Sequence, residues 1–172
     1  MPDSRPAADA SGDELLRRAS EFSGNLLNFF WRQGVSLSEG EDLVQETLLR
    51  LWNYRDRYSG KDAKLSTFLF ILARQVRIDA LRRRARRENR DRAWGEERGS
   101  SQPPAEACAA DDALWALSRL PEPHREVVEL GLMQDLPYAE VSAILGIPVG
   151  TVKSRMSNAM KKLKEIVDER GH

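Results

Sequence analysis

The spacing of apolar residues restricts this chain to helices. Apolar side chains recur at three- and four-residue intervals in both halves of the 172-residue sequence, and no segment alternates apolar and polar residues as a half-buried strand does. In the first half the pattern predicts helices at Asp13–Arg32, Glu41–Tyr54 and Ser66–Arg87, the last capped by Ser66. In the second half it predicts helices at Asp112–Leu120, Glu122–Met133, Pro137–Leu145 and Pro148–Glu169.

Residues 88–111 interrupt this periodicity and gather Gly, Ser and Pro, which is typical of a flexible linker. Residues 1–12, rich in Pro, Ala, Ser and Asp, are expected to form a disordered tail. The chain is therefore predicted to be all-α, with two small helical domains at residues 13–87 and 112–172. Each would bury only about 60% of the surface of its unfolded chain, so each is expected to need support from a partner.

Composition argues against several classes of protein. The longest nearly uncharged apolar stretch, Leu65–Ala73, is too short to span a bilayer, and residues 1–13 lack the apolar core of a signal peptide. We therefore expect a cytoplasmic protein without membrane insertion. Because Cys108 is the single cysteine, the chain has no disulfide framework and no cysteine-based zinc site, and we predict neither metal nor cofactor.

The equal numbers of basic and acidic residues, 27 of each, hide a strong segmentation. Residues 74–92 hold nine Lys or Arg against three Asp or Glu, whereas residues 93–135 hold three against nine. A basic block in a balanced chain suits a nucleic acid or an acidic partner, and it equally suits a solvated helix face.

The last two predicted helices have the spacing of a helix-turn-helix. Ser142 lets two helices approach, and Gly146 permits a tight turn between them. In the final helix, an apolar stripe leaves an opposite face that we call the reading face, made of Thr151, Lys153, Ser154, Arg155, Ser157 and Asn158. Short polar and basic side chains at the start of such a helix can reach base edges in a major groove. The alternative is a plain helical hairpin.

Two further surfaces are predicted in the first half. The docking strip lies opposite the apolar stripe of the second helix and consists of Asp42, Gln45, Glu46 and Leu49. Acidic and amide groups around an exposed leucine suit a basic helix, although a solvated face has similar composition. The strand-binding surface lies on the third helix and consists of Phe68, Arg74, Gln75, Asp79, Arg82, Arg83 and Arg84. Aromatic, amide and arginine groups suit unpaired bases and their phosphates, although the helix dipole alone favours some of these arginines.

Together these features resemble the extracytoplasmic-function (ECF) class of bacterial sigma factors, over nearly all of residues 13–169. The matching motifs are Glu41–Trp52, Ser66–Arg74 with Asp79–Arg83, Leu120–Leu130 and Gly150–Arg155. The resemblance implies that the docking strip contacts the coiled coil of the largest subunit of core RNA polymerase. It also implies that the third helix and the loop before it melt the promoter minus-ten element and capture its non-template strand. The final helix would read the duplex minus-thirty-five element, and an anti-sigma factor would regulate the protein.

Five positions depart from the family pattern, among them Pro137 and Pro148, which stand at helix starts where Ser is usual. Gln75 stands where Asn is common, Phe68 where Trp is frequent, and Asn158 where Arg is common, so the resemblance does not carry over the preferred promoter bases.

Two other functions fit parts of the sequence. A helix-turn-helix regulator that acts without polymerase leaves the docking strip and the arginine-rich helix unexplained. A DNA recombinase needs a nucleophile or metal-binding carboxylates, and Asp79 has no His, Cys or phosphate-binding glycine loop beside it. We therefore predict that the chain is not an enzyme.

Overall fold

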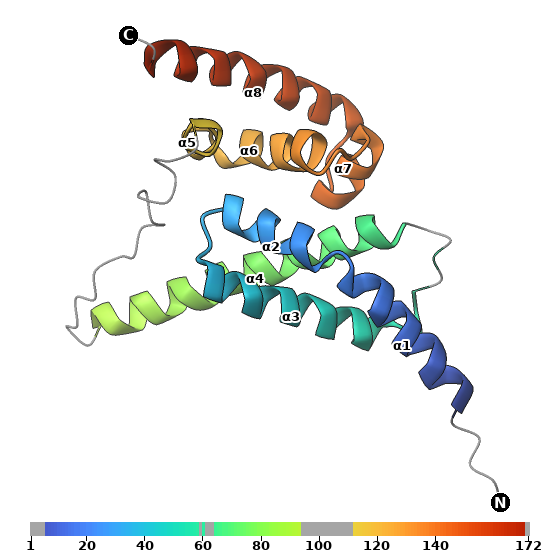
Figure 1. The fold of residues 1–172 in the computed structure, drawn as a ribbon. Coiled ribbons are helices and arrows are strands. Elements are labelled where there is room, and N and C mark those ends of the chain that lie inside the picture. Colours follow the sequence, from blue (N-terminus) through green and yellow to red (C-terminus); the bar gives the residue numbers. More distant parts are fainter. Residues whose placement is uncertain (1–5, 59, 61–63, 94–111, 171–172) are drawn as a thin grey trace, which may run out of the picture.

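The computed structural model describes residues 6–58, 60, 64–93 and 112–170. Helices account for its regular structure, which confirms the predicted all-α class (Figure 1). The elements are α1 (Pro6–Ser20), α2 (Ser23–Arg32), α3 (Leu37–Tyr54), α4 (Leu65–Ala93), α5 (Asp112–Ser118), α6 (Glu122–Val128), the π-helix η1 (Glu129–Met133), α7 (Tyr138–Leu145) and α8 (Val149–Arg170). None of these helices combines the length and the apolar character that a membrane span requires.

The amino-terminal part, residues 6–93 as far as described, packs α1, α2 and α3 against the first half of α4. Phe29 is central, because its ring meets Phe30 and Phe70 edge to face with centroids 5.5 and 5.6 Å apart. Leu51 and Val76 are fully buried in the same core. These contacts fix the orientation of α4, whose second half extends beyond the core (Figure 1).

The carboxy-terminal part, residues 112–170, packs α7 and α8 against α6 and η1. Its core includes Val127, Leu130, Val141, Val152 and Ala159, each at most 1% exposed. The two parts also pack against each other: α4 contacts α7, and α2 contacts α5. Figure 1 shows α5, α6 and α7 lying over α2 and α4.

Several predicted helix boundaries were wrong. The first helix begins at Pro6 rather than Asp13, and the segment predicted as Asp13–Arg32 is two helices that separate at Glu21 and Phe22. No proline marks this break, which lies where Ala19, Phe22 and Leu26 all pack into one core.

The third predicted helix also differs at both ends. It begins at Leu65, so Ser66 lies inside it and does not cap it. It continues past Arg87 to Ala93, although the linker is predicted to begin at Glu88. An ion pair one turn apart, from Arg84 Nε to Glu88 Oε1 at 3.0 Å, supports this extension without apolar contacts. The remaining predicted linker residues, 94–111, lie outside the described residues.

Candidate nucleic-acid interface

The helix-turn-helix has the predicted local geometry. Gly146 ends α7 in the left-handed region, with φ of 67°, which lets α8 begin only three residues later. The Ser142 hydroxyl donates to the carbonyl of Ile147 at 2.5 Å and fixes this turn. Val152, Met156 and Ala159 are buried, as the apolar stripe of the final helix required.

The reading face is only partly uniform. Lys153, Ser154, Ser157 and Asn158 are exposed, whereas Thr151 and Arg155 are half-buried. Arg155 turns toward a groove between α8 and α4. The structure therefore presents four of the six predicted side chains freely to solvent.

At the start of α4, aromatic side chains form a partly exposed platform. The Phe68 ring stacks on Tyr58 with centroids 5.2 Å apart and an interplanar angle of 21°, and Tyr54 meets Phe68 edge to face at 6.3 Å. Tyr58 precedes a loop that lies largely outside the described residues. Aromatic faces next to cations are the groups on which unpaired bases stack.

Further along α4, the strand-binding surface divides between two faces. Gln75 is exposed, whereas the neighbouring Arg74 points to the carboxy-terminal part, where its Nε lies 3.0 Å from Glu126 Oε1. The two side chains therefore do not form one site in this structure.

Asp79 and Glu46 belong to one ion-pair network rather than to separate surfaces. Arg50 Nη2 lies 2.8 Å from Asp79 Oδ2 and 2.9 Å from Glu46 Oε1, and Arg83 Nη2 lies 2.9 Å from Glu46 Oε2. The hydrogen bond from Arg50 lowers the pKa of the Asp79 carboxyl below its ordinary value, with Arg82 and Arg83 adding to the effect. The network thus joins the docking strip on α3 to the arginines of α4.

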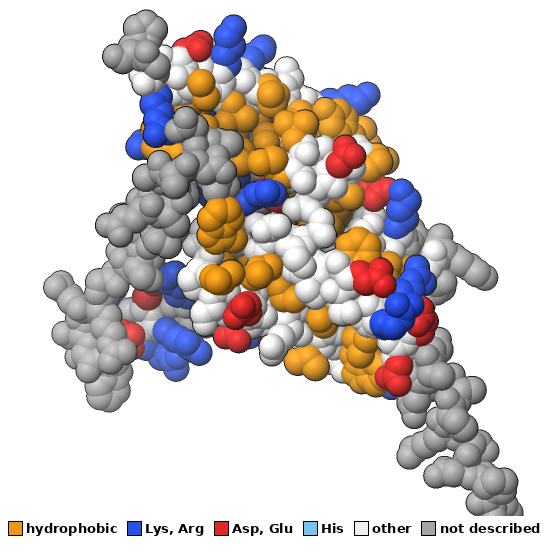
Figure 2. All heavy atoms as spheres, viewed as in Figure 1, with side chains coloured by type: hydrophobic (Ala, Val, Ile, Leu, Met, Phe, Trp, Pro, Cys, Tyr) orange, Lys and Arg blue, Asp and Glu red, His pale blue; other side chains and the backbone are white. Residues whose placement is uncertain are grey.

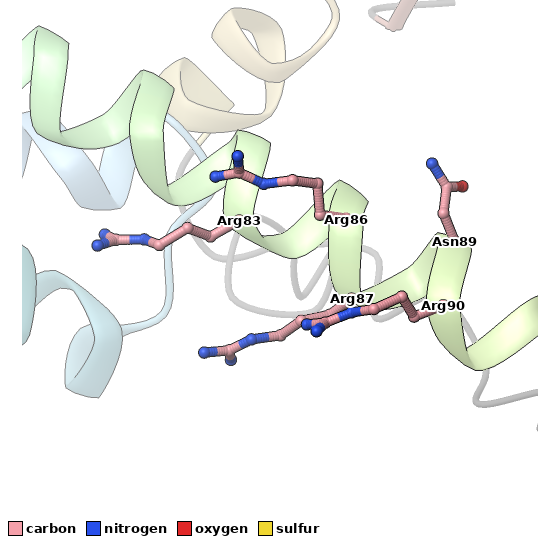
Figure 3. Close-up of a pocket in the computed structure, with 5 residues that line it drawn as sticks. All are labelled: Arg83, Arg86, Arg87, Asn89 and Arg90. Carbon is pink, nitrogen blue, oxygen red and sulfur yellow. The ribbon is translucent and has the colours of Figure 1, made fainter.

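The second half of α4 presents further arginines to solvent. Figure 3 shows Arg83, Arg86, Arg87 and Arg90 projecting from consecutive turns, and with Asn89 they line an open hollow of about 570 Å³. Of the predicted residues here, Arg82 and Arg83 are exposed, and Arg84 is half-buried beside Glu88. This part of α4 concentrates positive charge that suits phosphates.

The rest of the docking strip lies on the outer face of α3. Asp42 and Gln45 are exposed, and Leu49 is 64% exposed although it is a large apolar residue. An exposed leucine flanked by acidic and amide groups suits an amphipathic basic helix.

Sequence reasoning missed the polar residues at the seam between the two parts. Arg32, Arg77 and Glu126 are among them, and none belongs to a predicted surface. For Arg77 and Glu126 the only signal in the sequence is the basic block that precedes an acidic one, and Arg32 lies outside both blocks. Figure 2 shows acidic and basic side chains beside each other along this seam.

The chain matches two family models. Residues 20–87 match sigma-70 region 2, and residues 113–163 match sigma-70 region 4. The ECF RNA polymerase sigma factor SigL of Mycobacterium tuberculosis is 32% identical over 176 aligned residues, covering 97% of each chain. The ECF RNA polymerase sigma factor RpoE of Cereibacter sphaeroides is 30% identical over 146 residues, covering 84% of this chain and 81% of the relative.

Solved structures agree with these matches. The sigma factor RpoE of Bartonella quintana, in complex with the anti-sigma factor NepR, has a TM-score of 0.72 and 28% identity, covering 88% of this chain and 95% of that chain. CnrH, in complex with the cytosolic domain of CnrY, has a TM-score of 0.69 and 22% identity, covering 95% of this chain and 93% of that chain. This second similarity is one of fold.

Proposed function

Because this chain belongs to the ECF RNA polymerase sigma factors, we propose that its three surfaces divide promoter recognition among them. The chain is a transcription initiation factor that directs core RNA polymerase to promoters. The finer proposal is a role for each surface. Residues 6–93 form the domain for polymerase docking and minus-ten recognition, residues 94–111 connect it to the second domain, and residues 112–172 form the domain for minus-thirty-five recognition.

The docking strip contacts the polymerase coiled coil through Asp42, Gln45 and Leu49. Their exposure on the outer face of α3, away from the core, is the observation that supports this role. Glu46 belongs to the same strip, and its bonds to Arg50 and Arg83 connect polymerase docking to the arginines of α4.

The strand-binding surface holds the melted non-template strand. Phe68 offers a ring for stacking beside Tyr58, Gln75 offers an amide to an unpaired base, and Arg74 and Arg82 to Arg84 offer cations to phosphates. Asp79 acts through Arg50 and Arg82, which it holds by ion pairs, and thereby positions the surface.

The reading face enters the major groove of the minus-thirty-five element. Lys153 and Arg155 supply cations, Thr151, Ser154 and Ser157 supply hydroxyls, and Asn158 supplies the paired donor and acceptor that match adenine. The exposure of Lys153, Ser154, Ser157 and Asn158 on α8 supports this role.

Two more properties belong to the proposal. An anti-sigma factor regulates the chain, as the complex of the similar Bartonella quintana RpoE with NepR suggests. The chain acts in the cytoplasm, where it meets polymerase, and we assign it no catalytic step.

Reconstitution tests the proposal. The purified chain is expected to co-elute with core RNA polymerase and to start transcription at defined positions on duplex promoter DNA, whereas core alone is not. Co-elution without any promoter-dependent start would contradict the division of roles, because docking would then exist without recognition.

A further inference from the structure

The ion pairs that join the two parts all have the same polarity. Among the described residues, each pairs a cation of the amino-terminal part with a carboxylate of the carboxy-terminal part. The pairs are Arg32–Glu129 at 3.2 Å, Lys64–Glu140 at 2.7 Å, Arg74–Glu126 at 3.0 Å and Arg77–Glu122 at 2.9 Å. The carboxy-terminal part thus presents an anionic face to a cationic one.

Two of these pairs use arginines of α4 that belong to the strand-binding surface or lie one turn from a member of it. Arg74 belongs to that surface, and Arg77 follows it by one turn. Arg77 is only 7% exposed, and its Nε is buried without a hydrogen-bond partner among the described residues. Glu122 therefore satisfies only part of the guanidinium, which has five N–H donors in a planar fork.

The groove that contains these two pairs has more arginines than carboxylates. A groove of about 510 Å³ runs between α4 and the carboxy-terminal part, and its polar lining consists of Arg74, Arg77, Arg82 and Arg155 with Glu122 and Glu126. Four guanidinium groups face two carboxylates there. Arginine forks bind carboxylate and phosphate with the same bidentate geometry, so an excess of arginines suits a phosphate chain.

We propose that the carboxylates of Glu122 and Glu126 compete with the phosphates of the melted strand. Glu122 binds Arg77 and Glu126 binds Arg74 at the positions that phosphates take when the strand is bound. Closure of the two parts and binding of the strand then exclude each other, and Arg77 joins the strand-binding surface once it is uncovered. This inference rests on the proposed function.

The test compares two variants of the full chain with equal charge. Glu122→Gln with Glu126→Gln removes the two carboxylates at the groove, whereas Glu165→Gln with Glu169→Gln removes two exposed ones from α8. The probe is a fluorescent 15-nucleotide single strand of mixed sequence, without polymerase, since phosphate contacts do not depend on sequence. The groove variant is expected to bind about tenfold more tightly than both the control variant and the unmodified chain.

Two additions make the test specific. Adding Arg74→Gln and Arg77→Gln to the groove variant is expected to abolish the gain. Dyes at Asn53→Cys and Lys164→Cys, in a Cys108→Ser background, are expected to lose energy transfer in the groove variant and to keep it in the control. Circular dichroism establishes that each variant is helical.

Equal affinity of the groove and control variants would overturn the inference, as would a gain that survives loss of both arginines. The proposed function is measured separately, by transcription from a promoter with the unmodified chain and core polymerase. If that transcription occurs while the two variants bind the strand equally, the inference alone fails. If it does not occur, the proposed function fails.

Discussion

Asp42 and Gln45 are exposed on the docking strip, whereas Glu46 is engaged with Arg50 and Arg83. Replacing Asp42 and Gln45 with alanine is expected to weaken core polymerase binding, because charge-assisted contacts contribute about 1.5 to 3 kcal/mol each. Helix α3 should persist, since both residues lie opposite its core stripe. Titration of fluorescent chain with core polymerase measures the loss, and unchanged affinity with intact helicity would refute the docking role.

A substitution of Asn158 tests whether the reading face recognises bases. Because it is exposed on α8 and can pair with adenine, Asn158→Arg is expected to shift the preferred minus-thirty-five sequence. The shift should amount to about 1 to 3 kcal/mol at the contacted base pair. Transcription from a library randomised in that element measures it. Identical base preferences of the two proteins would show that Asn158 reads no base.

Single-residue exposure was largely predictable, but partners were not. Helical periodicity correctly placed Val152, Met156 and Ala159 inside, and Asp42 and Asn158 outside. It gave no sign that Asp79 pairs with Arg50, because those residues lie 29 positions apart on different helices. Which charged side chains pair depends on how the helices pack in the folded chain, and the local apolar periodicity does not determine that packing.

At the scale of elements, the turn between α7 and α8 depends on one backbone conformation. Gly146 has φ of 67°, and a Cβ there would meet no atom within 4 Å, so Gly146→Ala should cost only backbone strain of about 1 to 2 kcal/mol. Gly150 is the matched control, because a Cβ is equally free there but the residue is helical, so Gly150→Ala should leave stability equal or higher. Urea unfolding measures both, and equal stabilities of the two variants would contradict this account of the turn.

Helix positions were predicted better than helix ends. Ser36 caps α3 by accepting from the backbone of Glu39, yet apolar spacing alone had placed the start of that helix at Glu41. The extension of α4 to Ala93 depends on polar contacts such as Arg84–Glu88, which a search for apolar periodicity overlooks. Boundaries set by caps and ion pairs are therefore the least visible in a sequence.

At the scale of the molecule, acid should loosen the contact between the two parts. Hydrogen bonds from Lys64 and then Thr67 lower the pKa of Glu140, so its contribution is complete above the ordinary carboxyl pKa and is lost as pH falls through the lowered one. The difference in unfolding free energy between the unmodified chain and Glu140→Gln should thus shrink from about pH 6 to about pH 3. Glu129, whose pKa burial raises, acts in the opposite sense but is common to both proteins. A difference that stays constant over this range would contradict the role of Glu140.

The packing of the two parts was the least predictable feature. Arg74–Glu126 and Arg77–Glu122 span 52 and 45 positions, and each residue read alone looks like an ordinary charge on a helix. The opposite charges of residues 74–92 and 93–135 were visible, but charge blocks do not specify which side chains meet. The fold class and the helix-turn-helix followed from local patterns, whereas the seam arises from tertiary contacts.

One measurement tests most directly whether the chain recognises promoters through two elements. Core polymerase with this chain selects active templates from a library randomised at both the minus-ten and minus-thirty-five positions, and the chain alone is offered the same DNA. We expect two enriched elements at a fixed spacing, obtained only with polymerase and altered separately by variants of Gln75 and Asn158. Enrichment of one duplex element by the chain alone, with no dependence on polymerase, would contradict the account and indicate a stand-alone helix-turn-helix regulator.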